Sequence, residues 1–330
     1  MPDRAGPWDA PRRLAAAAPG AGAVIATVTR LAVATVAMIT LVVALAPTLG
    51  VAMGGSAAMP HSVGAPPERQ STAAPVSSPN PGVAPRSNFP RVDSAHVDRV
   101  RGDTVPPRRL SRGEIDRLLA ASSDDHPADL RNVDLSGLDL GGVDFRGADL
   151  TGSRLTGTSF VRARMFGVTL SRAVAREADF SDAVLDVAVL RGTDLTRAKL
   201  RRASLYATIL IGADLSGADL TGARVIAALN NARLVGATLT DARVGADPGN
   251  QPMGLMRTDL SDADLRDATL TRADLRKTEL TRANLTGADL TDADLTGANL
   301  AGTVLHRIRG RDRIRGLDRA RNVDRALFDP

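Results

Sequence analysis

The stretch that decides the fold reads ADLTG at residues 148–152, and it returns as ADLSG at 213–217 and as ADLTD at 288–292. In each copy a small residue and an aspartate precede a leucine, and two short polar or glycine residues follow it. Leucine or a close substitute stands at every fifth position from Leu130 to Val225, with Ala175 as the one lapse. The fold must therefore be inferred from a repeat rather than from a single motif.

The five-residue spacing continues beyond Val225 with two interruptions. The step from Val225 to Leu229 is four residues, and the regular spacing then holds to Val244. The step from Val244 to Leu255 is eleven residues, after which the regular spacing resumes. The second interruption is rich in turn-forming residues, so it predicts a protruding loop at residues 245–254. Such a loop is either a functional feature or an insertion that the surface tolerates.

A period of five fits neither regular element, because five steps turn a helix by about 140° and end on the opposite face of a flat strand. If each unit forms one side of a square, four units close a coil of about 20 residues, and every centre residue points at its axis. The small residue two positions earlier is then a steric requirement of a narrow interior. The expected core is made of the centre residues, which include Leu150, Leu195, Leu215, Leu265 and Leu290.

These units resemble the A(D/N)LXX repeat of the pentapeptide-repeat family. The resemblance implies an all-β fold over residues 128–305, a right-handed quadrilateral β-helix whose coils stack through backbone hydrogen bonds. Some members of that family present a strongly acidic surface to DNA gyrase in place of DNA. The aspartates that precede the centre leucines are expected to bond the nearby backbone.

The ends of such a solenoid must be covered, because they expose unpaired backbone groups. Residues 108–127 predict a short capping helix in which Ser111 and Glu114 form a capping box, with apolar residues following on one side. The Arg-rich segment 306–330 is expected to cover the other end.

The N-terminal region predicts a membrane attachment. Residues 31–54 carry no charge and are long enough to span a bilayer as a helix, and the basic segment 1–30 precedes them. The positive-inside rule then leaves the N-terminus in the cytoplasm and the solenoid outside. A cleaved signal peptide, which would release the protein, is the alternative. Residues 55–107 are rich in Pro, Ala and Ser and are expected to be a disordered linker.

Composition argues against several functions. The chain has no cysteine and four histidines, none of them spaced as metal ligands, and no phosphate-binding or nucleophile motif. We therefore expect no enzymatic activity, no metal and no cofactor. Residues 129–305 hold 21 basic and 23 acidic side chains. A surface that replaces DNA must be strongly negative, so a nucleic-acid mimic or a nucleic-acid partner is not expected.

One part of the expected outer surface is apolar. Residues twenty positions apart lie on the same side of a four-unit coil, which groups seven side chains on one face or two adjoining faces: Phe166, Val184, Val189, Tyr206, Ile209, Ile211 and Ile226. Such a stripe is a candidate face for a partner or for self-association, although packing between neighbouring coils would also explain it. The sequence thus favours a non-enzymatic interaction or structural scaffold, tethered to the membrane. A cytoplasmic gyrase-binding DNA mimic is the alternative.

Overall fold

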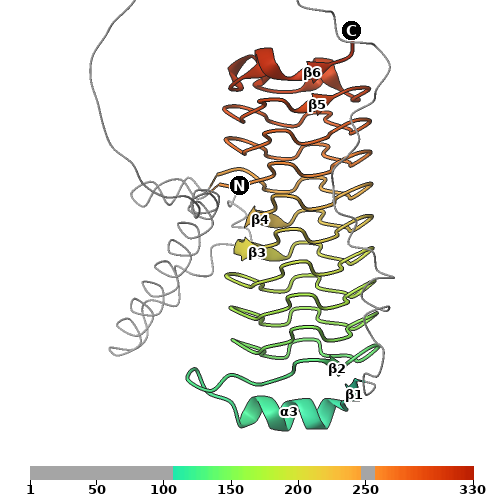
Figure 1. The fold of residues 1–330 in the computed structure, drawn as a ribbon, viewed down its shortest axis with the longest axis vertical. Helices are drawn as coiled ribbons and strands as arrows, with labels where there is room; N and C mark the ends of the chain where they lie inside the picture. Colours follow the sequence, from blue (N-terminus) through green and yellow to red (C-terminus); the bar gives the residue numbers. More distant parts are fainter. Residues whose placement is uncertain (1–106, 247–256) are drawn as a thin grey trace, which may run out of the picture. The chain divides into compact units, whose positions relative to one another are not determined.

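A computed structural model of the chain describes residues 107–246 and 257–330 (Figure 1). The chain divides into two units, Met1–Arg86 and Ser87–Pro330, and every described residue lies in the second. The expected membrane segment 31–54 and most of the expected loop 245–254 lie outside the described residues. Within the described ranges, no helix is both long and apolar enough to cross a membrane.

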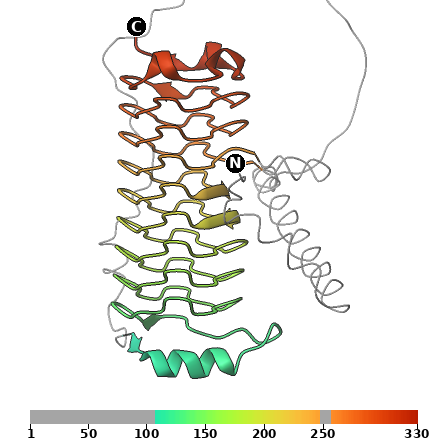
Figure 2. The same cartoon turned by 180° about the vertical axis from the view of Figure 1, so that it is seen from behind.

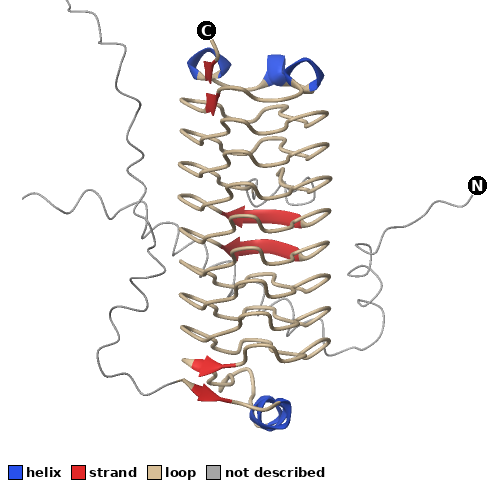
Figure 3. Ribbon diagram, turned by 90° about the vertical axis from the view of Figure 1, so that its right-hand side faces the viewer, coloured by secondary structure: helices blue, strands red, loops and turns tan. Residues whose placement is uncertain are grey.

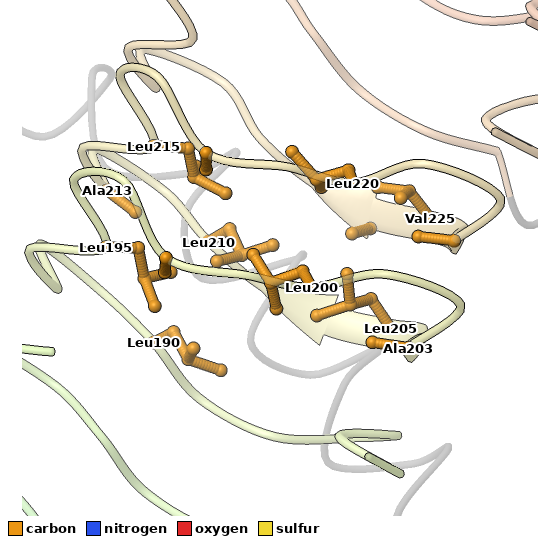
Figure 4. Packing of buried hydrophobic residues seen from close by; sticks show 14 of the residues in the cluster. Leu190, Leu195, Leu200, Ala203, Leu205, Leu210, Ala213, Leu215, Leu220 and Val225 are labelled. Atoms are coloured by element: carbon orange, nitrogen blue, oxygen red, sulfur yellow. The ribbon is translucent and has the colours of Figure 1, made fainter. Parts of the chain in front are cut away.

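The repeats form a column of stacked four-sided coils (Figures 1 and 2). Parallel bridges join positions twenty residues apart, as between Asp129 and Asp149. We number the four faces of each coil by their centre residues, and the corner that follows each face takes the number of that face. In one coil the centres of faces 1 to 4 are Leu190, Leu195, Leu200 and Leu205 (Figure 4).

Backbone hydrogen bonds hold each unit to the next coil. The Leu195 N–H donates to the Asp214 carbonyl at 2.7 Å, and the Arg197 N–H donates to the Ser216 carbonyl at 2.9 Å. The Ala198 N–H closes the corner onto the Leu195 carbonyl at 2.9 Å. Most corners are thus tight turns of two residues, and the straight part of most sides is too short to form a long strand.

The interior holds the centre residues and the small residues beside them (Figure 4). Leu150, Leu195, Leu215, Leu265 and Leu290 are all fully buried. At most positions where a hydroxyl side chain replaces the usual alanine, it bonds the coil below: Thr193 Oγ1 donates to the Leu170 carbonyl at 2.7 Å. The five-residue pattern therefore predicted the core correctly.

The second residue of most corners is left-handed. Glycine adopts this conformation without strain, as at Gly157 with a φ of 64°. Many other corners place a residue with a side chain there, including Arg162 with a φ of 57° and Val187 with a φ of 62°. Aspartates before the centre support the turns, since the Asp149 carboxylate accepts a bond from the Thr151 N–H at 2.9 Å.

Helix α3 (Arg112–Ala120) and strand β1 (Arg108–Arg109) lie at the N-terminal end of the column (Figure 1). Strand β1 pairs in parallel with β2 (Val133–Asp134), and Ile115 of the helix is fully buried. The capping box is present: the Ser111 N–H donates to the Glu114 carboxylate at 2.8 Å. This bond, with further bonds from the Ser111 hydroxyl and from Arg108, lowers the pKa of Glu114 to about 2.

The C-terminal end is one further coil made of six-residue units, which the five-residue pattern did not predict. The units read IRGRDR at 308–313, IRGLDR at 314–319 and ARNVDR at 320–325. The last three residues of each form a short 3-10 helix, namely η5 (Arg311–Arg313), η6 (Leu317–Arg319) and η7 (Val323–Arg325) (Figure 3). Strand β6 (Leu327–Phe328) then pairs with β5 (Val304–Leu305) of the coil below.

The register after the second interruption differs from the expected one. Ala228 bridges Asp259, so Leu260 is stacked on Leu229 and takes its place on face 1. Leu255, expected as the first centre after the interruption, lies outside the described residues. Leu260 is the first centre after the interruption that the structure describes.

Candidate functional site: an apolar corner of the solenoid

Corner 4 differs from the other three corners. It carries the two longest strands among the described residues, β3 (Ser204–Ile209) and β4 (Arg224–Ala228), which pair in parallel (Figure 3). The repeat keeps its five-residue step in β3 but has the four-residue step in β4. The pairing of the two strands therefore shifts register between Tyr206 and Thr208. One residue fewer leaves β4 no room for the usual turn, so the chain runs extended across the corner.

Backbone contacts stack four of the corner residues in one row. The Gly167 N–H donates to the Asp186 carbonyl at 3.0 Å, and the Val187 N–H donates to the Tyr206 carbonyl at 2.8 Å. Tyr206 pairs directly with Ile226 between the two strands. The row therefore runs from Phe166 through Asp186 and Tyr206 to Ile226, and a charged residue interrupts its apolar character.

The seven expected face residues differ in exposure. Phe166 in the row and Val184 on face 4 are each 38% exposed, whereas Ile226 and Ile209 are only 5% and 9% exposed. The expectation that all seven form an outward stripe is wrong for these two isoleucines, because the extended chain through β3 and β4 turns them away from solvent.

The other three expected residues are partly exposed. Tyr206 lies in the row, and Val189 bridges Ile209 on face 1. Ile211 lies on corner 1, beyond face 1, and so is separated from Phe166 by the full width of that face. The surface that the structure supports, which we call the corner-4 patch, consists of Phe166, Val184, Val189 and Tyr206.

Polar groups fix the middle of the corner-4 patch. The Asp186 carboxylate accepts a hydrogen bond from the Tyr206 N–H at 3.0 Å and another from the Ser204 hydroxyl. The Arg224 guanidinium lies over the Tyr206 ring, 4.3 Å from its centroid, in a cation–π contact. These contacts hold Tyr206 in one orientation beside the exposed apolar side chains.

Backbone strain is also present at this corner. Val187 adopts a φ of 62°, a conformation in which a β-branched side chain is a genuine outlier. Strained residues tend to persist at sites that bind or switch, although strain alone does not define one.

Both interruptions of the repeat occur at corner 4, in successive coils. The four-residue step lies between Val225 and Leu229, and the longer interruption follows Val244 at the same corner of the next coil, where the Ala246 N–H still donates to the Arg276 carbonyl at 2.9 Å. The sequence showed both interruptions, but their shared corner became visible only when the pairing was known. Within residues 107–246 and 257–330, no group of three His, Asp or Glu side chains is placed to hold a metal ion.

Comparisons with known families agree with this geometry. The family described as pentapeptide repeats matches in eight copies, over residues 128–226 and 258–309 taken together. The matched segments leave out residues 227–257, although residues 229–244 stack in the column like the matched repeats. The family match supports the resemblance seen in the residues.

Solved structures of pentapeptide-repeat proteins are similar to this chain. HetL, involved in heterocyst differentiation regulation in the cyanobacterium Nostoc sp. strain PCC 7120, is 29% identical over 66% of this chain and 94% of its own, with a TM-score of 0.32. QnrB1, a plasmid-mediated fluoroquinolone resistance protein, is 16% identical over 59% of this chain and 89% of its own, with a TM-score of 0.33. At these scores neither structure supports an argument about function. A comparison with curated protein sequences gives no match.

Proposed function

We propose that this pentapeptide-repeat solenoid is a non-enzymatic interaction scaffold that binds a partner protein at the corner-4 patch. The observation that carries the proposal is the exposure of Phe166 on corner 4 and of Val184 on face 4, which leads into that corner. The other exposed large apolar residues of the described ranges, Leu118 and Leu327, lie at the two ends of the column. Exposed aromatic side chains such as Phe166 are enriched among the anchors that dominate protein interfaces.

The rigid column suits this role. Hydrogen bonds between coils fix the backbone of the column, so little backbone conformational entropy remains to be lost when a partner binds. The proposal assigns no task to the buried rows, which serve the fold.

The proposal includes attachment to the membrane through residues 31–54, with the solenoid outside the cytoplasm. It is supported by the uncharged run from Leu31 to Ser56 and the basic residues before it. Fusions of a reporter active only outside the cytoplasm, placed after residue 107 and before residue 31, test this part. We expect activity from the first fusion alone. Activity from neither fusion, with both proteins present, would contradict it.

The gyrase-binding alternative has no specific observation in its favour. Basic and acidic side chains are nearly equal in number over residues 129–305, and a surface that takes the place of phosphates needs an excess of acid.

Co-purification from native membranes tests the binding surface. A Phe166→Asp variant places a charge in the corner-4 patch, and Leu327→Asp places the same charge on an exposed leucine at the C-terminal end. We expect a specific protein to co-purify with the wild type and with Leu327→Asp, and to be lost from Phe166→Asp. Equal recovery with all three proteins would refute the proposed surface.

A further inference from the structure

A second surface, at corner 3, carries an order of charges that ion pairs within one molecule do not explain. The second residues of this corner form one row along the column, since their N–H groups bond the neighbouring coil, as from Asp182 to the Arg201 carbonyl and from Gly222 to the Thr240 carbonyl, both at 2.9 Å. After Gly142 at the N-terminal end, the row reads: Arg162, Asp182, Arg202, Gly222, Asp241, Arg272 and Asp292.

Neighbouring charges in this row already pair within the chain. Arg202 contacts the Asp182 carboxylate at 2.7 and 2.8 Å, and Arg272 contacts the Asp241 carboxylate at 2.7 Å through both nitrogens. Hydrogen bonds from these arginines lower the pKa of Asp182 and of Asp241. Alternating signs along one row are thus explained by ion pairs between successive coils.

The order of signs at Gly222 is not explained by those pairs. An uninterrupted alternation would place an acid at position 222 and a base at position 241. Instead the lower triad (Arg162, Asp182, Arg202) has a net charge of +1 and the upper triad (Asp241, Arg272, Asp292) has −1. If a second copy is rotated by 180° so that its upper triad faces the lower triad of the first copy, each arginine therefore lies opposite an aspartate.

In the flanking rows the same rule holds for every symmetry-related pair in which both residues are charged. On face 4, Arg164 and Asp294 lie three coils below and above the level of Arg224, and Asp144 and Arg315 lie four coils below and above it. On face 3, counting from Asp219, Asp139 and Arg309 lie four coils below and above that level. All three pairs combine opposite charges.

Asp219 and Arg224 lie at the level about which the charges are symmetric, so each would face its own copy in a second chain. Each of the two already has a partner within its own chain. Asp219 pairs with Arg201 at 2.9 Å, and Arg224 lies over the Tyr206 ring. In the corner row itself the centre is Gly222, whose missing side chain permits a close approach.

We propose that corner 3 is an interface for a second copy of this chain, packed side by side and antiparallel, with the twofold axis at the level of Gly222. The interface is isologous, so each lower triad faces the partner's upper triad. The inference rests on the proposed role as an interaction scaffold and names one partner of that scaffold. It uses corner 3, which is distinct from the corner-4 patch.

The pairing should be weak and sensitive to salt. Exposed ion pairs contribute little individually, and Arg202, Arg272 and Asp241 have side chains more than half exposed. Because the Debye length is about 8 Å at physiological ionic strength and shrinks as salt is added, dissociation with added salt is expected.

Cross-linking of the full chain tests the orientation. The chain has no cysteine, so introduced ones are unique. Val161→Cys and Thr291→Cys place thiols on corner 3, three coils below and above the level of Thr221. In a mixture of the two variants, a short bis-maleimide should join one to the other and neither to itself. Cross-links of each variant to itself would indicate a parallel pair and overturn the proposal, as would the absence of any cross-link.

Charge reversal tests the complementarity without breaking the pairs inside a triad. The lower-reversed variant is Arg162→Asp, Asp182→Arg and Arg202→Asp. The upper-reversed variant changes its triad in the same way and also carries Arg313→Asp, because Arg313 pairs with Asp292 at 2.6 Å. We expect each variant alone to lose the dimer in sedimentation velocity, and an equimolar mixture to regain it as a heterodimer.

The matched control exchanges an ion pair at another corner. Asp262 and Arg282 pair at 2.6 Å on corner 1, and Asp262→Arg with Arg282→Asp should leave the dimer intact. A dimer that survives in either reversed variant alone, or a mixture that stays monomeric, would overturn the proposal. The proposed function fails separately, if Phe166→Asp leaves partner recovery unchanged, since no reversed residue lies in the corner-4 patch.

Discussion

Replacing Gly316 by alanine should loosen the C-terminal coil through a steric clash. Gly316 is the third residue of the second six-residue unit of that coil and has a φ of 68°. A Cβ atom built there would lie 2.9 Å from the Thr296 Cα, closer than real Cβ atoms approach. The added methyl therefore meets backbone that is fixed by the coil below, and the coil must shift to accept it.

The expected cost has two parts. A left-handed residue with a side chain costs roughly 1–2 kcal/mol relative to glycine, and overpacking costs typically about 1–3 kcal/mol more. Gly302→Ala is the matched control, because Gly302 has a φ of 69° and its nearest neighbour would be the flexible Arg282 side chain at 3.4 Å. The control should show the backbone cost alone.

Hydrogen exchange measures the difference where it arises. The reporting amides are those of Arg309, Arg315 and Arg321, each of which bonds the coil below at 2.8 Å. The steric part predicts exchange at these amides about 5- to 150-fold faster in Gly316→Ala than in Gly302→Ala. Equal exchange in the two variants would refute the claim that the six-residue units fit closely onto the last regular coil.

Three further predictions concern local features of the column. Val187→Gly should raise the free energy of unfolding by roughly 1–2 kcal/mol in urea denaturation, because glycine relieves the left-handed strain at a φ of 62°; a loss of stability would contradict this. Thr193→Val should lower it by about 1 kcal/mol, because the bond to the Leu170 carbonyl is lost, whereas Thr156→Val at an exposed corner serves as its control. The pKa of Glu114 is lowered to about 2 from 4.5, so the stabilisation from its ionised form is full above pH 4.5 and is lost as the pH falls towards 2; amides of α3 should exchange faster at pH 3 than at pH 5 after correction for intrinsic rates, and Glu114→Gln should remove that difference.

The sequence predicted those parts of the fold that depend on local spacing. The centre leucines, the small residues beside them and the N-terminal capping box follow from the types of neighbouring residues, and all are present in the structure. The handedness of the coil and the membrane segment stay predictions.

The parts that the sequence did not predict depend on pairing between distant residues. Leu255 fits the five-residue spacing as well as Leu260 does, and only the bridge from Ala228 to Asp259 decides between them. Ile226 is buried because the four-residue step removes one corner residue. The spacing of the repeat alone does not predict whether the remaining side chain points inward or outward. The six-residue units at the C-terminus were readable in the sequence, because isoleucine or alanine followed by arginine recurs every six residues from Ile308.

Site-specific photo-cross-linking in the intact cell tests whether a partner protein lies against the corner-4 patch. A photoreactive phenylalanine analogue at position 166 would lie in the corner-4 patch, and the same analogue at Thr286, on corner 2, is the control. The account predicts a cross-linked protein at position 166 that is absent at position 286. The same products at both positions, or none at position 166 while the protein is folded and present, would contradict the claim that this corner is the binding surface.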